Sequence, residues 1–239
     1  MKHWWAVIIL GVALGWGPSA AMAADADEER WTAGLSAGAS AQWMIEPTDD
    51  EGEPTVLYGS AFRGPGMVIG PSLQIDVGPI DELDVAVELE GLYGYQRASG
   101  FARHSESGQI DVTLSQHVFR FPAQLVARGW AGDVPVFFGA GLEPVVGVHS
   151  ASSVETDGVD VPIAALATRP VTSVGALASL GIDLSYGEQV IPVSLRVAYD
   201  PSVPESSRGR LEGYESDEEP GEFGVQFDLT VMMTVGFRL

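Results

Sequence analysis

Candidate catalytic side chains occur close together in one segment, from His149 to Glu155. This segment combines a histidine and a carboxylate with Ser150, Ser152 and Ser153, and hydrolases use these residue types to activate a serine through a histidine base. The spacing is unfavourable, because His149 and Ser150 are adjacent and neighbouring residues of a β-strand point to opposite faces. We therefore expect no catalytic site and no enzymatic activity.

Metal binding is the second chemistry that the sequence offers. His117 and His149 are expected at the same end of neighbouring antiparallel strands, where they could approach each other. A zinc site needs three or four protein ligands, and His104 is the only histidine left outside the N-terminal segment. We therefore expect no metal site and no cofactor. The chain has no cysteine, so it forms no disulfide.

The charge of the chain is strongly negative, at −21 by formal count, and Lys2 is its only lysine. Nucleic acid is excluded as an expected partner, because binding to phosphates needs a basic surface. The acids concentrate in two segments that also contain glycine and proline: Asp49, Asp50, Glu51 and Glu53 in the first, and Glu215, Asp217, Glu218, Glu219 and Glu222 in the second. We expect solvated loops, with weak binding of divalent cations as the sharper hypothesis.

The element that positions these residues is clearest in the last stretch, Phe223 to Leu239. Every odd position there is apolar, and seven of the eight even positions are small or polar. A period of two indicates a β-strand whose faces meet different environments. Soluble strands usually have about 5–6 residues, whereas a strand crossing a bilayer needs about 9–11. The stretch therefore predicts a membrane-spanning strand.

The same alternation occurs in seven earlier stretches. They are Arg30–Glu46, Ile69–Val77, Leu83–Gln96, Ile110–Arg128, Val134–Val148, Val174–Tyr186 and Ile191–Asp200. In the fourth of them the apolar positions change phase between Ser115 and Val118, which predicts a bulge or a boundary between loop and barrel. The connections are alternately long and short, and Gly78–Asp81, Gly129–Asp133 and Gly187–Gln189 are the expected short turns.

The N-terminus has the pattern of a secretory signal peptide over residues 1–23. A short basic start precedes an apolar run from Trp4 to Gly15 and a cleavage site at Ala21-Met22-Ala23. Residues 24–239 are then one domain. The predicted fold is all-β, an antiparallel up-and-down transmembrane β-barrel of eight strands, whose even number returns both ends of the wall to one side. A barrel of ten strands would need an extra hairpin that includes Val159–Ala167.

The barrel predicts a place for aromatic and charged residues. Aromatic residues fall at both ends of the apolar faces, where interfacial girdles form: Trp31, Tyr186 and Phe237 at the periplasmic rim, and Trp43, Tyr93, Tyr95, Tyr199 and Phe223 at the outer rim. Charges on the polar faces lie in the lumen and must be paired there. This predicted cluster comprises Arg120, Arg128, Arg196, Arg238, Asp76, Asp84, Glu88, Glu90, Glu143, Asp183 and Asp228.

In its alternation, its rhythm of loops and its C-terminal strand, the chain resembles the OmpA/OmpX-like family of eight-stranded outer-membrane β-barrels. The resemblance covers Arg30 to Leu239 and carries no catalytic motif. It implies a location in the outer membrane, contact with outer-membrane lipid and lipopolysaccharide, and insertion by the barrel-assembly machinery. Members commonly end in an aromatic residue that this machinery reads, whereas here Phe237 keeps the register and Leu239 is last.

We therefore expect a small non-enzymatic outer-membrane barrel with an envelope-structural or surface-interaction role through acidic extracellular loops. Three alternatives remain. A narrow gated channel for small solutes would open if a luminal ion pair changed partners. A lipid A-modifying enzyme would use the His149 segment, although the His-x-Ser spacing of lipid A deacylases with this fold is absent. A soluble lipocalin-like binder would turn the apolar faces inward.

Overall fold

The computed structural model describes residues 30–44, 62–104, 108–155, 168–187, 189–201 and 223–238. The chain separates into two compact units, Met1–Arg30 and Trp31–Leu239, and the second contains all of the described strands. The predicted signal peptide, both acidic segments and the Val159–Ala167 segment lie outside the described residues. Within the described ranges, no helix is long and apolar enough to cross a membrane.

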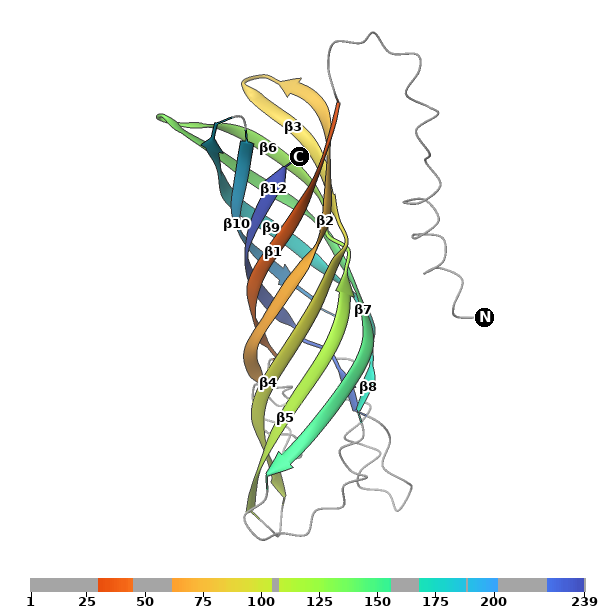
Figure 1. The fold of residues 1–239 in the computed structure, drawn as a ribbon. Coiled ribbons are helices and arrows are strands. Elements are labelled where there is room, and N and C mark those ends of the chain that lie inside the picture. The colour runs from red at the N-terminus through yellow and green to blue at the C-terminus, as the bar shows by residue number, and fades with distance from the viewer. Residues whose placement is uncertain are drawn as a thin grey trace, which may run out of the picture. The chain divides into compact units, whose positions relative to one another are not determined.

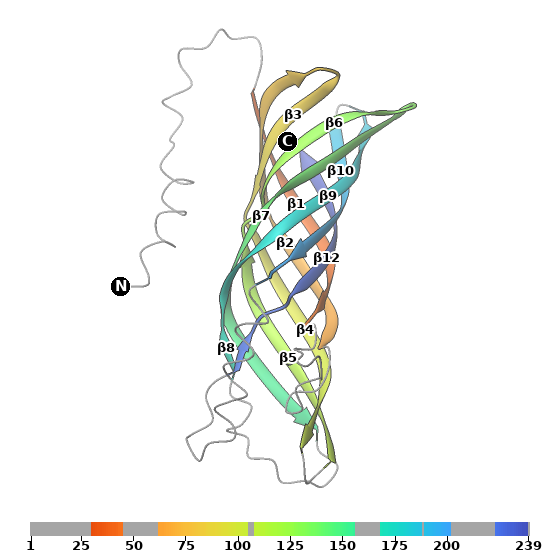
Figure 2. The same cartoon turned by 180° about the vertical axis from the view of Figure 1, so that it is seen from behind.

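Antiparallel strands form one sheet that closes on itself (Figure 1). The strands of this wall are β1 (Trp31–Trp43), β2 (Arg63–Ile80), β3 (Leu83–Glu90), β4 (Leu92–His104), β5 (Gly108–Arg120), β6 (Ala123–Ala131), β7 (Val134–Glu155), β9 (Thr172–Tyr186), β10 (Gln189–Tyr199) and β12 (Leu229–Arg238). Closure is made between the first and last of them, with Ala37 opposite Val235. Viewed from behind, the tilted strands continue around the wall (Figure 2).

Two passes of the chain through the wall are each divided into two strands by a short irregularity. β3 continues into β4 through Gly91, and β5 continues into β6 through Phe121 and Pro122. Hydrogen bonds bridge both breaks, because the carbonyl oxygens of Pro71 and Pro144 accept from Gly91 N at 3.0 Å and from Phe121 N at 2.9 Å. Proline has no N–H to donate, so it interrupts a ladder. The described chain thus makes eight passes, which confirms the predicted eight-stranded wall.

Short turns join the strands at the end of the wall where β12 finishes (Figure 1). Gly132 and Gly187 adopt φ of 65° in two of them, a conformation that glycine adopts without steric cost. The first turn differs from the prediction of Gly78–Asp81. Gly78 lies inside β2 beside a register shift, and the turn is Asp81–Glu82, with Asp81 at φ 56°.

The two surfaces of the wall carry the side chains that the alternation predicts, apolar outside and polar inside. Large apolar side chains such as Met67 and Leu180 are each 62% exposed on the outer surface, whereas Gln42, Gln96 and Thr234 are buried inside. This distribution, with apolar residues outside and polar residues inside, is the reverse of that in a soluble carrier with an apolar cavity. The described strands therefore have the side-chain distribution of a transmembrane β-barrel.

The C-terminal strand is shorter than predicted. β12 begins at Leu229, and the preceding β11 (Phe223–Val225) pairs in parallel with β8 (Thr168–Pro170) outside the wall. The neighbouring strands explain the break. Leu229 pairs with Trp43, the last residue of β1, and with Tyr199, the last residue of β10. Beyond Leu229 the ladder has no further strand to pair with, which an alternation within one strand cannot reveal.

The pairing of β5 has an irregularity in the predicted place, between His117 and Val118, but the predicted change of phase within β5 is wrong. Every even position from Val112 to Arg120 is buried, so β5 keeps one phase and Val112 and Leu114 point inward. The irregularity lies on the opposite strand, where His117 pairs with His149 but Val118 pairs with Gly147. Val112 and Leu114 are apolar because the interior at this height is apolar, not because they face lipid.

Candidate functional site: the barrel lumen

The lumen is filled in layers, and the layer nearest the long loops is apolar. We call it the apolar cap; it consists of Met44, Phe62, Ala98, Val112, Leu114 and Val225. Val225 comes from β11 and is 1% exposed. The inward-facing Gln116 fixes it, because Gln116 Nε2 donates a hydrogen bond to the carbonyl oxygen of Val225 at 3.0 Å. The segment before β12 thus folds into the mouth of the barrel.

A buried ion pair lies beneath the apolar cap. Arg120 Nη1 contacts Glu143 Oε1, and Arg120 Nη2 donates to Thr230 Oγ1 at 3.2 Å. All three side chains are buried and come from β5, β7 and β12, so the pair joins distant parts of the wall. A cavity of about 30 Å³ adjoins Gln96 and Arg120. It is large enough for a water molecule but not for a solute path.

A second apolar layer divides the lumen below that pair. This apolar waist consists of Val68, Leu92 and Met232, from β2, β4 and β12. Leu92 and Met232 have no exposed surface. Met232 is the one even-numbered residue of the C-terminal stretch that is neither small nor polar, and its inward position now has a packing role.

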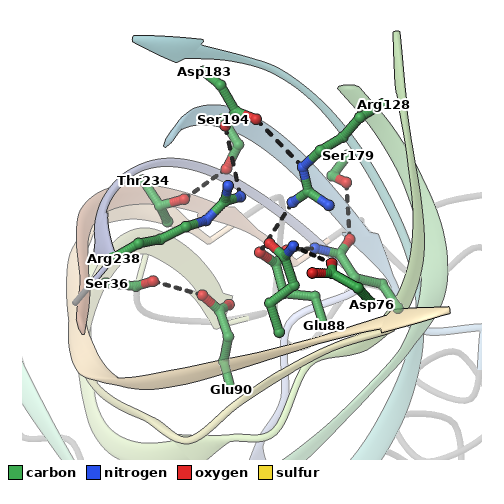
Figure 3. Close-up of polar contacts among 12 residues, drawn as sticks. Ser36, Asp76, Glu88, Glu90, Arg128, Ser179, Asp183, Ser194, Thr234 and Arg238 are labelled. Carbon is green, nitrogen blue, oxygen red and sulfur yellow. Dashed lines mark hydrogen bonds and ion pairs between the residues drawn. The ribbon is translucent and has the colours of Figure 1, made fainter. Parts of the chain in front are cut away.

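The second tightly buried ion pair joins β10 to β3. Arg196 Nη1 contacts Glu90 Oε2, Arg196 Nη2 donates to Glu90 Oε1 at 3.2 Å, and Arg196 Nε donates to Ser194 Oγ at 3.0 Å. Ser36 Oγ donates to the same Glu90 Oε1 at 2.6 Å (Figure 3). Each charge therefore has hydrogen-bond partners in addition to its counter-charge, as a desolvated ion pair requires.

At the turn end, four charged side chains form a looser cluster of ion pairs (Figure 3). Asp183 lies 3.3 Å from Arg128 Nε and 3.6 Å from Arg238 Nη2, and Arg128 Nη2 lies 3.9 Å from Glu88 Oε1. Glu88 Oε2 accepts a hydrogen bond from Gln124 Nε2 at 2.6 Å. One carboxylate thus neutralises two guanidinium groups, and Arg128 also approaches a second carboxylate, that of Glu88.

The structure brings most of the predicted luminal charges together, and three acidic members of the cluster lie outside the ion pairs described above. Asp84 is exposed beside the Asp81–Glu82 turn and contributes no ion pair that the structure records. Asp228 is buried near the apolar cap, where its carbonyl oxygen accepts from Asp200 N at 2.7 Å. Asp76 accepts a hydrogen bond from Gln74 Nε2 at 2.6 Å.

Buried glutamines are the luminal residues that the charge-based prediction missed. They are Gln42, Gln74, Gln96, Gln116, Gln124 and Gln226. Several join layers: Gln124 Oε1 accepts from Ser179 Oγ at 2.8 Å, and Gln226 Nε2 donates to Asp200 Oδ2 at 2.8 Å. The alternation placed most of them on the polar faces, so an inventory of all polar inward positions would have found them, whereas Gln116 lies where the predicted phase of β5 changed.

On the outer surface, most predicted girdle residues lie at the ends of the apolar belt. Trp31, Tyr93, Tyr186 and Tyr199 are exposed there, and the partly buried members are Trp43, Tyr95 and Phe237. Phe223 belongs to β11 and not to the wall, so its predicted girdle position is wrong. Trp130 falls in a predicted turn, but it lies in β6 and is strongly exposed near the turn end.

The two rim histidines meet across the ladder, as the sequence suggested. His117 and His149 are direct partners with ring centroids 6.0 Å apart, and Tyr93 Oη lies 2.5 Å from His117 Nδ1. Ser150 Oγ is buried in the wall, whereas His149 is exposed, so the two do not form a nucleophile–base pair. Among the described residues, no group of three His, Cys, Asp or Glu could hold a metal ion.

A closed wall of eight antiparallel passes, apolar outside and filled with polar side chains inside, defines a small transmembrane β-barrel. Its architecture is that of the OmpA/OmpX-like eight-stranded barrels. No family model and no curated protein matches the chain.

Two solved proteins illustrate the similarity. Neisserial surface protein A is 14% identical over 87% of this chain and 95% of its own, with a TM-score of 0.33. Ail, the attachment invasion locus protein of Yersinia pestis, is 13% identical over 88% of this chain and 100% of its own, with a TM-score of 0.34. At these values the comparisons add no argument, and the class rests on strand pairing and side-chain facing.

Proposed function

We propose that this protein is a non-enzymatic barrel of the bacterial outer membrane that fills its own lumen and acts through its surface. The apolar exterior supports the location, because a strand barrel with an apolar belt is built for a bilayer. The filled lumen supports a role that the protein performs through its surface and not through its interior. The acidic segments at residues 49–53 and 215–222 are the proposed extracellular contact surfaces, with envelope-structural or surface-interaction functions and weak affinity for divalent cations.

The observation that carries this proposal is the alternation of layers along the lumen. The apolar cap and the apolar waist interrupt the polar interior. A cavity of about 30 Å³ lies beside Arg120, and one of about 10 Å³ lies beside Arg196 and Arg238. An ion would have to lose its hydration shell to pass either apolar layer, which is costly without compensating ligands. A plugged barrel is therefore favoured over an open pore.

A gated channel is the second candidate, and one feature favours it. Asp183 is shared by Arg128 and Arg238 at the turn end, so either arginine could take over the whole interaction. Such an exchange would reorganise that end of the lumen. It would leave the apolar waist in place, and a conducting path would require Leu92 and Met232 to move as well.

The proposal predicts a heat-modifiable outer-membrane protein that does not conduct. Unheated and boiled samples of the outer-membrane fraction should migrate differently on a denaturing gel, because a closed barrel resists detergent until heated. In planar bilayers the purified protein should give no discrete current steps, with a large-pore porin as the positive control. Reproducible steps would favour the gated channel, and the absence of the chain from the membrane fraction would contradict the location.

The enzymatic alternative has a separate test. Expression of the protein should leave the mass spectrum of lipid A unchanged, because His149 faces outward and Ser150 inward. A loss of one acyl chain that disappears in a His149→Ala variant would contradict the non-enzymatic proposal. An acyl loss that persists in that variant would be attributed to the host.

A further inference from the structure

Arginine and histidine side chains line one part of the outer wall at the end nearest the long loops. We call Arg63, Arg97, His117 and His149 the basic rim patch. Arg63, Arg97 and His149 are exposed and His117 is half-buried, and all four share the outward phase of their strands. They belong to β2, β4, β5 and β7, which are consecutive in the wall.

The strand register makes these four residues a continuous line. Arg63 is opposite Ser99, so Arg97 is its diagonal neighbour. Arg97 is opposite Ser115, which makes His117 the next diagonal neighbour, and His117 is directly opposite His149. Diagonal neighbours on one face of a sheet lie about 7–8 Å apart, within the reach of long side chains.

The line follows one height of the barrel because the strands are tilted (Figure 1). The heights of residues on different strands can be compared by following direct partners around the wall from His149. The path runs through Tyr95 on β4, Met67 on β2 and Ala39 on β1, and it returns to β7 at Phe138, much closer to the turn end than His149. Successive direct partners therefore lie closer and closer to the turn end. Each diagonal step of the patch leads back toward the loop end and compensates for this shift. The patch is consequently a horizontal band and not a vertical stripe.

This band lies at the edge of the apolar belt that faces the loop end of the wall. Trp43, a predicted outer-rim aromatic, is the direct partner of Arg63 on β1. On the turn-end side of the band the outer face carries Phe119 and Leu142, and on the loop-end side the strands of the patch carry Ser99, Thr113 and Ser153. The change from apolar to polar residues marks the height at which a bilayer ends and headgroups begin.

The band is positive in a chain whose formal charge is −21. The luminal arginines are paired with luminal carboxylates, whereas Arg63 and Arg97 face outward beside serine and threonine. On the outer face of β5, the carboxylate nearest to the patch is that of Asp111. It lies closer to the loop end of the strand than Ser115 does. Two outward arginines side by side can bind an anionic group that lies outside the protein.

We propose that the basic rim patch binds the phosphate-bearing headgroup of an outer-leaflet lipid. The inference rests on the outer-membrane location proposed above. Guanidinium groups form paired hydrogen bonds to phosphate oxygens, and their apolar stems can lie along the belt while the charge reaches the headgroups. The imidazoles of His117 and His149 add N–H donors at the same height. The acyl chains of the lipid would lie along the apolar belt on the turn-end side of the patch, over Phe119 and Leu142.

The test is a lipid titration of the full chain purified in detergent, with bound lipid counted by native mass spectrometry. Diphosphorylated lipid A is compared with the same lipid after its phosphates are removed. The wild-type protein should prefer the phosphorylated form about tenfold, as expected for charge-assisted hydrogen bonds. The Arg63→Gln/Arg97→Gln variant should lose this preference and keep its affinity for the dephosphorylated lipid.

Arg169→Gln is the matched control, because it removes an exposed arginine from β8, outside the wall. It should keep the preference, and millimolar inorganic phosphate should not displace the lipid. An equal loss in the control, a preserved preference in the double variant, or displacement by phosphate alone would each overturn the inference. The variants must first show heat-modifiable migration. If the wild type is a non-conducting outer-membrane barrel without a phosphate preference, this inference fails and the proposed function stands.

Discussion

Replacing Arg196 with leucine is expected to lower the free energy of unfolding by about 3–5 kcal/mol, the usual cost of removing one partner from a buried ion pair. The side chains of Arg196 and Glu90 are 5% and 1% exposed, so the remaining carboxylate would stay in the interior without its counter-charge. Ser36 would still donate its hydrogen bond to Glu90, but one hydroxyl does not replace a guanidinium group. Unfolding of the protein in lipid vesicles by urea measures this change.

Glu90→Leu and the double variant Arg196→Leu/Glu90→Leu complete a thermodynamic cycle. The single variant should cost a similar amount, whereas the double variant should recover most of the loss, because no unpaired charge remains inside. Asp84→Leu is the matched control on the same face of β3, and because Asp84 is exposed its effect should stay within about 0.5 kcal/mol. Additive losses in the double variant would contradict a coupled, desolvated pair.

The wall of the barrel could be predicted from the sequence because its physical cause is local. Each strand separates lipid from lumen, and neighbouring residues such as Leu195 and Arg196 record that separation directly as a period of two. The number of passes and the short turns follow from counting such stretches. Even the closure between β1 and β12 was implied by an even count with both ends at one side.

The errors arose where one environment replaced another along the same strand. Val112 and Leu114 are inward and apolar because the lumen contains an apolar cap, and alternation reports polarity rather than direction. Val225 continues the apolar phase of the C-terminal stretch but packs into that cap after the ladder has ended at Leu229. A single sequence does not contain the lengths of the neighbouring strands, which decide where a ladder stops.

The pairing of the luminal charges was also beyond the sequence. The inward phase placed both Glu90 and Arg196 in the lumen, yet they are 106 residues apart in the chain and belong to strands that are not neighbours. Which charges meet across a barrel depends on strand tilt and stagger, which fix the heights of residues relative to one another. Asp84 shows the same limit, because its phase is inward but its height leaves it exposed beside a turn.

Replacing Leu180 with arginine should lower the free energy of unfolding by about 2–4 kcal/mol in lipid vesicles, as expected for an arginine near the bilayer midplane. Leu180 is 62% exposed on the outer surface, and its direct partners on either side are Phe138 and Leu195. In a water-soluble protein, an arginine at so exposed a position would change stability by less than about 0.5 kcal/mol. The size of the loss therefore measures what surrounds the wall.

Ser153→Arg provides the matched control on the outward face of β7, beyond the height of His149. This arginine would lie among headgroups or in water, so the free energy of unfolding should change by no more than about 1 kcal/mol. Both variants are unfolded by urea from the same vesicles, and the difference between them isolates the cost of burying a charge in hydrocarbon. Equal, small effects at the two positions would mean that the apolar belt does not face lipid, and the transmembrane assignment would then fail.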